Sequence, residues 1–295
     1  MKTPLRYPGG KSRAVETLMS FVPEDCGEVC SPFLGGGSFE LALAEKGIKV
    51  HGYDAFKPII WFWDAILKDP DKLATMADQY RRKKTYKHTK PGVDKEDNPH
   101  LEQKIRALGL PEKDFYRFRE EILFALQSNH PFTFDAAAKV YAINRSSFSG
   151  ATFSGGFSER ASYARFTDSQ IEYVRNFKVD NFTVKRADFK DSIKKHEDCC
   201  LYLDPPYFLD TARAKLYGVE GDMHSFFPHM ALYSILRKRD NWILSYNDCE
   251  EIRELYRDFE IHEVEWAMGM KNVQSKKIKK KKRQGKSSEI VITNF

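Results

Sequence analysis

The chain has few cysteines and no long apolar segment. Its five cysteines form no CxxC pair, so we expect reduced thiols that pack as small apolar side chains, and no metal site or disulfide framework. The most apolar run, PIIWFWDAIL, is short and is interrupted by Asp64. The first residues, MKTPLRYPGGKSR, have no apolar stretch as long as a signal peptide needs. These absences favour a soluble cytoplasmic protein without a membrane partner.

Positive charge is concentrated in one place. The formal net charge of the 295 residues is +6, but residues 276–286, KKIKKKKRQGK, carry eight Lys or Arg and no acid. The rest of the chain has 40 basic and 42 acidic residues. Such a run is either a solvated surface loop or a contact to nucleic acid phosphates, where clustered cations gain affinity by releasing counterions. We predict Lys279 and Lys281 as DNA contacts, and a second basic run at 81–90 points the same way.

Strand and helix signals alternate at both ends of the chain. EVCSPF, SFELALAEKG and IKVHGYD predict strand, helix and strand, and from about residue 178 strands and helices alternate again up to EIVITNF. Residues 61–177 are helical and charged instead. This pattern predicts an α/β fold with a doubly wound, mostly parallel sheet. We expect one domain built from 1–60 and 178–295, interrupted by a helical insertion at 61–177.

A glycine cluster, FLGGGSF, lies between a predicted strand and a predicted helix. Asp54 ends the next strand, where an acid accepts hydrogen bonds from ribose hydroxyls. The cluster lacks both the GxGxxG spacing of dinucleotide enzymes and the GK[ST] ending of phosphate loops, which favours an adenosine cofactor without pyrophosphate over a purely structural turn. Lys11, after a Pro-Gly-Gly turn, would pair with a cofactor carboxylate. Together these features indicate S-adenosylmethionine.

The stretch CCLYLDPPYFLD ends a predicted strand with an acid, two prolines and a tyrosine. An exocyclic amine on a heteroaromatic ring is a poor nucleophile, because its lone pair is delocalised into the ring. Asp204 can accept one of its N–H groups and the carbonyl of Pro205 the other. Pro205 and Pro206 fix φ and carry no N–H, so the turn presents acceptors in a rigid geometry, and Tyr207 offers a face for stacking. The alternative is an ordinary turn after a strand.

Residues 186–189, RADF, end the strand before this turn. Asp188 would bond the amino group of the cofactor's adenine, with Phe189 against the ring. By itself this acid would be an unremarkable surface residue.

These motifs in this order resemble the Dam-type family of DNA adenine methyltransferases, the DPPY class. The resemblance rests on YPGGK, PFLGGGSF, GYDA, ADF, DPPY, SYND and VITNF, although the three consecutive glycines and the long lysine-rich run depart from the usual pattern. It implies a Rossmann-like class I S-adenosylmethionine-dependent fold with an inserted target-recognition domain. The implied catalytic residues are Asp204, Pro205, Pro206 and Tyr207. The implied cofactor-binding residues are Tyr7, Gly10, Lys11, Phe33, Gly35, Gly36, Gly37, Asp54, Asp188, Phe189 and Asp204.

The resemblance also implies a substrate. We expect methylation of the N6 amino group of adenine in double-stranded DNA after base flipping. NRSSFSGATFSGG falls where the family has a DNA-reading hairpin or loop, so Asn144, Arg145 and Ser147 are predicted DNA contacts, with plain loop structure as the alternative. Tyr217 and His224 either close over the flipped base or lie in a loop without contact. A monomer or weak dimer is expected, and restriction-modification, with a cognate restriction endonuclease as partner, or evasion of phage defence is a fitting role.

Other functions use similar residues. Methylation of a glutamine or asparagine side-chain amide resembles NPPY rather than DPPY, which weighs against it, whereas methylation of the cytosine amino group or of an RNA base stays open. A catalytically silent DNA-binding module is a third class. The intact motif residues argue against that class.

Overall fold

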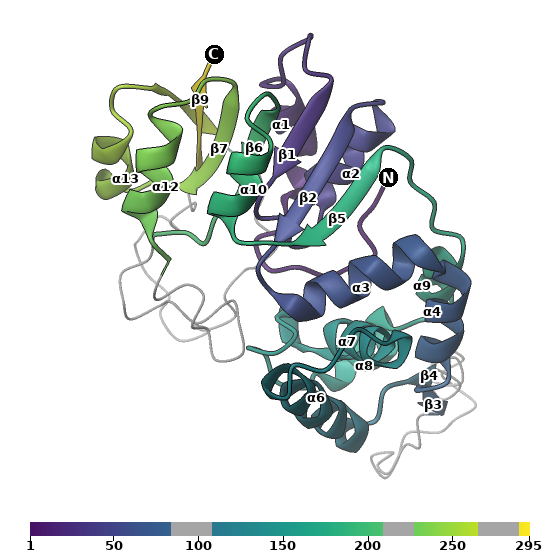
Figure 1. Cartoon of the computed structure of the whole chain (residues 1–295). Helices are drawn as coiled ribbons and strands as arrows, with labels where there is room; N and C mark the ends of the chain where they lie inside the picture. Colours follow the sequence, from purple (N-terminus) through teal and green to yellow (C-terminus); the bar gives the residue numbers. More distant parts are fainter. Residues whose placement is uncertain (84–107, 209–226, 265–288) are drawn as a thin grey trace, which may run out of the picture. The chain divides into compact units, whose positions relative to one another are not determined.

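The structure is a computed structural model that describes residues 1–83, 108–208, 227–264 and 289–295 (Figure 1). Its internal contacts divide the chain into two compact units. Unit 1 comprises Met1–Thr3, Tyr7–Phe56 and Val179–Phe295, and unit 2 comprises Pro4–Arg6 and Lys57–Lys178. The roles that we predict for 61–177 and for the flanking segments stay predictions.

Unit 1 contains a seven-stranded sheet in the order β5-β2-β1-β6-β7-β9-β8. The pairs β5·β2, β2·β1, β1·β6 and β6·β7 are parallel, and β9 is antiparallel to both of its neighbours. This confirms the predicted α/β class with a mostly parallel sheet. The strands are β1 (Glu28–Ser31), β2 (Lys49–Asp54), β5 (Phe182–Arg186), β6 (Cys200–Leu203), β7 (Trp242–Asn247), β8 (Glu260–Val264) and β9 (Glu289–Asn294).

Helices pack on both faces of this sheet, as a doubly wound fold requires. On one face, α10, α12 and α13 bury an apolar cluster with inward-pointing strand residues, among them Leu201, Trp242 and Ile292. On the other face, Phe39 of α2 packs against Tyr202 of β6, with ring centroids 4.5 Å apart. The helices of unit 1 are η1 (Lys11–Arg13), α1 (Val15–Met19), α2 (Ser38–Glu45), α10 (Phe189–Lys195), α12 (His229–Leu236) and α13 (Glu250–Leu255).

The carboxyl ends of the parallel strands meet at one edge of the sheet. Asp54 is the last residue of β2, Asp204 follows β6, and Asp248 follows β7. Because β9 runs the other way, its first residue, Glu289, lies at this same edge, opposite Asn247. The topology therefore gathers acidic side chains where open α/β sheets bind their ligands.

Unit 2 is mainly helical. Some of its helices begin at side-chain caps: the Asp69 side chain accepts a hydrogen bond from the Lys72 amide at the start of α4, and Thr133 accepts one from the Ala136 amide at the start of α7. The fully buried rings of Trp63, Phe115 and Tyr141 form part of its core. The elements are α3 (Lys57–Lys68), α4 (Pro70–Asp78), the antiparallel pair β3 (Arg82–Lys83) and β4 (Leu108–Gly109), α6 (Glu112–Gln127), α7 (Phe134–Ser146), η2 (Phe148–Gly150), α8 (Glu159–Arg165) and α9 (Asp168–Arg175). Over the described ranges of both units, no helix combines the length and apolarity that crossing a membrane requires.

Candidate active site

A carboxylate and two prolines follow directly after β6. Leu203 is the last, fully buried residue of the strand, and Asp204 is the next residue. Pro205 is buried and Pro206 is half-buried, and neither has an N–H group to donate. The sequence prediction that DPPY forms a rigid turn at a strand end agrees with this arrangement.

Two residues from distant parts of the chain reach this turn. Lys11 Nζ donates to Asp204 Oδ1 and to the Tyr207 hydroxyl, both at 2.7 Å. The Tyr207 hydroxyl donates to Glu289 Oε2 at 2.7 Å, and the same oxygen lies 3.6 Å from Lys11 Nζ. The Lys11 and Glu289 side chains are only 5% and 3% exposed, so these charged contacts are little screened by water. We call Lys11, Asp204, Tyr207 and Glu289 the Lys11 network.

Sequence reasoning did not find Glu289. Its signal is an acid at the start of an otherwise apolar strand, EIVITNF, but the strand's position beside β7 is not visible in the sequence. The sequence predicts that Lys11 pairs with a cofactor carboxylate. In the structure the Lys11 ammonium is engaged by the chain's own Asp204 and Tyr207.

Burial controls the protonation of this site. Burial raises the pKa of Asp204 to about 6; the Lys11 charge opposes this shift, and the Glu289 charge adds to it. Burial also raises the pKa of Tyr207 well above its ordinary value, so its hydroxyl stays a neutral donor near pH 7. A third acid on the α2 face, Glu40, accepts a hydrogen bond from the Ser31 hydroxyl at 2.7 Å, and burial raises its pKa to about 7.

The glycine cluster is shaped around Tyr7. A Cβ on Gly35 would lie 2.7 Å from Tyr7 Cε1, and a Cβ on Gly36 would lie 2.8 Å from Tyr7 Cβ. Gly37 has φ 64°, a left-handed conformation, where it precedes α2. The Gly10 amide closes a tight turn by donating to the Tyr7 carbonyl at 3.1 Å. These glycines therefore permit a close approach between the cluster and the YPGGK segment. The sequence predicts that they permit a close approach of a ligand instead.

Asp54 is held by the backbone around it. Its Oδ2 accepts from the Gly35 amide at 2.9 Å and its Oδ1 from the Phe56 amide at 2.8 Å. Burial raises the pKa of Asp54 to about 6, although both hydrogen bonds oppose the shift. The carboxylate thus links the end of β2 to the glycine cluster.

Three phenylalanines gather near the predicted adenine-binding acid. The Phe33 and Phe189 rings stack with centroids 5.7 Å apart, and Phe227 lies 5.5 Å from each of them. Asp188 caps α10 by accepting from the Lys190 amide at 2.9 Å. The structure therefore brings Phe33, Asp188 and Phe189 together, as the sequence predicts, and adds Phe227.

Asn144 and Arg145 lie at the end of α7 and not in a loop. Asn144 is 1% exposed, and its amide group donates to the Arg6 and Gly150 carbonyls and accepts from the Arg6 amide. Arg145 is 6% exposed and donates to the carbonyls of Arg165 and Pro4. Because these polar groups already satisfy buried backbone groups, the arrangement favours the structural alternative over direct base contacts.

Ser147, the third predicted DNA contact, is also fully buried. Its hydroxyl donates to the Asn144 carbonyl at 3.0 Å and accepts from the Thr152 amide at 3.1 Å. The predicted contacts Lys279 and Lys281, the run at 276–286, and the loop residues Tyr217 and His224 lie outside the described residues.

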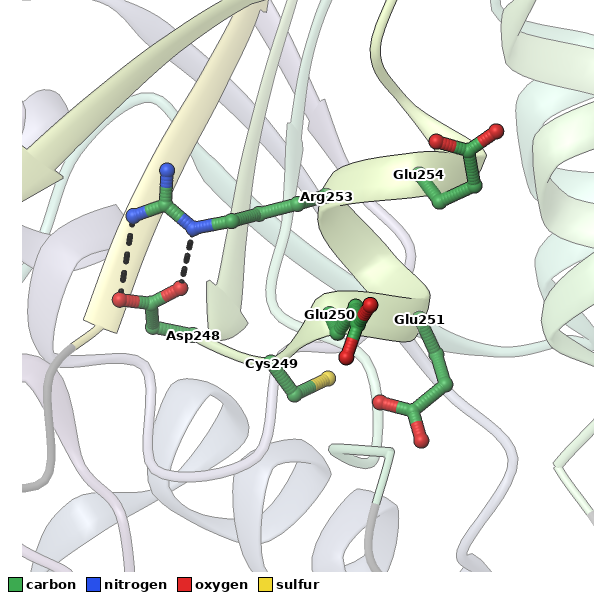
Figure 2. A pocket seen from close by; sticks show the side chains of 6 residues that line it. All are labelled: Asp248, Cys249, Glu250, Glu251, Arg253 and Glu254. Atoms are coloured by element: carbon green, nitrogen blue, oxygen red, sulfur yellow. Dashed lines mark hydrogen bonds and ion pairs between the residues drawn. The ribbon is translucent and has the colours of Figure 1, made fainter.

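A surface pocket lies at the start of α13 (Figure 2). Its lining residues are Asp248, Cys249, Glu250, Glu251, Arg253 and Glu254. Arg253 pairs with both oxygens of Asp248, at 2.5 and 3.1 Å. The lining shares no residue with the Lys11 network or the glycine cluster, and its excess of acids disfavours DNA phosphates. We assign no role to it.

Comparison with known proteins identifies a family and a distant relative. The model of the D12 class N6 adenine-specific DNA methyltransferase family matches residues 7–270. The chain is 21% identical to the type II methyltransferase M1.LlaDCHI of Lactococcus lactis subsp. cremoris over 297 aligned residues, which cover 98% of this chain and 94% of the relative. The family match includes the glycine cluster, Asp54 and the DPPY turn, whereas Glu289 lies beyond it.

Proposed function

The chain belongs to the D12 class N6 adenine-specific DNA methyltransferase family and is therefore an adenine-specific DNA methyltransferase, and we propose that S-adenosylmethionine is its methyl donor and that Asp204 binds the reacting amine. The observation that carries this proposal is the acceptor-only turn after β6, whose carboxylate is held by Lys11 at 2.7 Å.

The chemical task of the site is to make an adenine amino group nucleophilic. An ionised Asp204 accepts a hydrogen bond from one N6–H group, and the Pro205 carbonyl accepts a hydrogen bond from the other. Both bonds localise the nitrogen lone pair and orient it, which lowers the barrier by positioning as well as by charge. Lys11 favours the ionised form of Asp204, and Glu289 fixes Lys11 and Tyr207, so Glu289 acts as a positioning residue.

The residues near the glycine cluster fit S-adenosylmethionine. Its sulfonium supplies an electrophilic methyl group when it is bound. Asp54, with two backbone hydrogen bonds and a place at the end of β2, suits ribose hydroxyls. The stacked Phe33 and Phe189 rings beside Asp188 suit an adenine ring and its amino group.

The proposed substrate is double-stranded DNA. The substrate adenine must leave the duplex to reach the Asp204 carboxylate, and Tyr207 offers a ring for it to stack on. Unit 2 is the proposed target-recognition part, with Asn144 and Arg145 as its internal framework. A modification role paired with a restriction endonuclease rests on the name of the Lactococcus relative alone.

Transfer of labelled methyl groups tests the function directly. Purified protein, S-adenosylmethionine with a labelled methyl group and unmethylated double-stranded DNA are expected to give label in N6-methyladenine after hydrolysis. The same reaction with RNA or with protein as acceptor is the control. Label in N4-methylcytosine, RNA or a side-chain amide, with none in adenine, would replace the proposal by one of the alternatives.

Turnover is expected to depend on pH through Asp204. Its pKa of about 6 means that lowering the pH through 6 protonates the carboxylate, which then loses its negative charge and becomes a much weaker acceptor. We expect kcat to fall about tenfold per pH unit below 6 and to be constant above it. The measurement is the pH profile of single-turnover methylation.

Glu40 provides the matched control, because its pKa of about 7 makes it a rival source of this profile. Glu40→Gln should keep the fall in rate below pH 6, which we call the acidic limb of the profile, whereas Asp204→Asn should remove this limb. A limb that disappears in Glu40→Gln would assign the titration to Glu40 and contradict the role of Asp204.

A further inference from the structure

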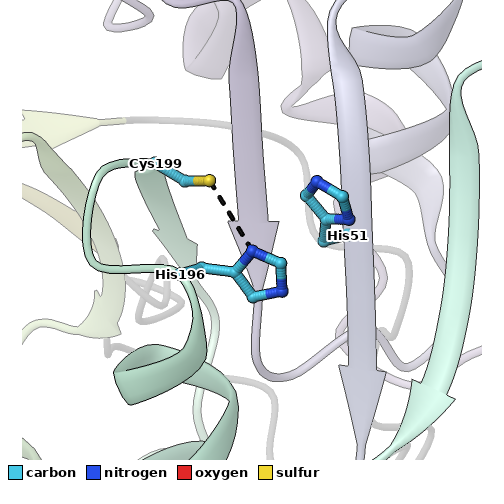
Figure 3. A group of neighbouring side chains, drawn as sticks. All are labelled: His51, His196 and Cys199. Carbon is cyan, nitrogen blue, oxygen red and sulfur yellow. Dashed lines mark hydrogen bonds between the residues drawn. The ribbon is translucent and has the colours of Figure 1, made fainter.

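Four side chains with metal-ligating atoms lie together on the face of the sheet that α10 covers. His51 is on β2, His196 follows α10 and Cys199 precedes β6 (Figure 3). One ring nitrogen of each histidine and the Cys199 sulfur all lie within 4.8 Å of one another. Glu28, the first residue of β1, adds a carboxylate oxygen. We call these four residues the His–Cys cluster.

The Glu28 carboxylate connects two members of the cluster. Its Oε2 lies 3.1 Å from His51 Nε2 and 3.8 Å from Cys199 Sγ. His196 Nδ1 lies 3.7 Å from the same sulfur. In a tetrahedral zinc site with bonds of 2.0–2.3 Å, neighbouring ligand atoms are about 3.3–3.6 Å apart. The three separations are therefore within a few tenths of an ångström of the required values.

The second nitrogen of each imidazole already has a partner. His196 Nε2 lies 2.8 Å from the Tyr53 hydroxyl, and His51 Nδ1 lies 3.3 Å from the Thr183 hydroxyl. Zinc-binding histidines show this arrangement, in which a hydrogen bond at one nitrogen fixes the ring and leaves the other nitrogen for the metal. The partners thus assign His196 Nδ1 and His51 Nε2 as the ligand atoms, the same two atoms that face Cys199 and Glu28.

We propose that the His–Cys cluster binds one zinc ion. Two neutral imidazoles, one thiolate and one carboxylate neutralise the charge of a divalent ion, and the thiol proton passes to solvent as the sulfur binds. The imidazole rings now stack with centroids 4.3 Å apart, and the Glu28 carboxylate contacts His51 and Cys199, so the two rings and the Glu28 side chain must move to bring all four ligand atoms to tetrahedral separations. All four side chains are at least partly accessible, which permits this movement and the entry of the ion.

The site is separate from methyl transfer. Glu28 and Cys199 lie at the amino-terminal ends of β1 and β6, whereas Asp204 follows the carboxyl end of β6. A bound ion would join β1, β2 and the turn before β6, so its effect is on stability. The sequence predicts no metal because the ligands come from three separate segments and form no CxxC motif.

Cobalt titration tests the proposal, since Co²⁺ reports on zinc sites by its absorption. The metal-free full chain is expected to bind one Co²⁺ with a sulfur-to-cobalt charge-transfer band in the near ultraviolet, and Zn²⁺ should displace it. Cys199→Ser should lose the band. Glu28→Gln changes an exposed side chain with little risk to folding and should weaken Zn²⁺ binding, and Tyr53→Phe should weaken it about tenfold.

Cys249→Ser is the matched control, because Cys249 is another half-buried thiol outside the cluster. It should keep the band and the affinity. A wild-type protein without a charge-transfer band, or with the same band and Zn²⁺ affinity as Cys199→Ser, would overturn the proposal. Methylation by Cys199→Ser is expected to match wild type, so the outcome is independent of the proposed function.

Discussion

Asp204→Ala is expected to lower kcat for DNA methylation by about 100- to 1,000-fold, with a much smaller change in cofactor affinity. The substitution removes the carboxylate that accepts a hydrogen bond from an N6–H group, and this bond strengthens as the nitrogen attacks. The Pro205 carbonyl stays in place, so some catalysis by positioning remains. Single-turnover methylation and equilibrium binding of S-adenosylmethionine, measured on the same preparation, separate the two effects.

Two further variants divide the effect of Asp204 into its parts. Asp204→Asn keeps an acceptor oxygen but loses the charge, so its kcat should lie between those of wild type and Asp204→Ala. Glu40→Gln removes a buried acid on the α2 face and should keep kcat within a few fold of wild type. Normal methylation by Asp204→Ala would end the assigned role, and a loss confined to cofactor binding would move Asp204 from the amine to the cofactor.

The α/β class could be predicted because the five parallel strands, β1, β2, β5, β6 and β7, are short and each is followed by a helix signal. EVCSPF, IKVHGYD and NWILSYND correspond to β1, β2 and β7, within a few residues at their ends. The position of β9 could not be predicted, because an antiparallel strand between β7 and β8 is a matter of long-range pairing. Nothing in EIVITNF itself indicates its neighbours.

The parts of the site that could be predicted are those formed by local sequence motifs. The glycine cluster, Asp54 and DPPY each lie within a few consecutive residues, and the sheet places their segments at one edge. Glu289 was missed because its contact with Tyr207 spans 82 residues. Asn144 and Arg145 look like exposed loop residues in the sequence, yet α7 extends through both and buries them against the Pro4–Arg6 segment of unit 2.

Lys11→Met is expected to destabilise the protein by about 3–5 kcal/mol at pH 8, because it leaves the Asp204 and Glu289 carboxylates without their cation. Methionine keeps most of the volume of the lysine side chain, so lost packing contributes little. The loss should appear as a fall in the melting temperature of roughly 10 °C. It should also raise the pKa of Asp204 further and move the acidic limb of the methylation profile to higher pH.

A second substitution separates lost charge pairing from general damage. Glu289→Gln keeps an acceptor for the Tyr207 hydroxyl but removes one of the two orphaned charges, so Lys11→Met/Glu289→Gln should be more stable than Lys11→Met alone. Lowering the pH should also stabilise Lys11→Met relative to wild type. The raised pKa of Asp204 makes the folded variant bind a proton more tightly than the unfolded chain does. The difference in melting temperature between Lys11→Met and wild type should therefore shrink as the pH falls from 8 to 5. The opposite result would be that the stability losses of Lys11→Met and Glu289→Gln simply add in the double variant, and that the melting-temperature difference between Lys11→Met and wild type is constant with pH. It would show that Lys11 contributes by packing and that the buried charges are not coupled.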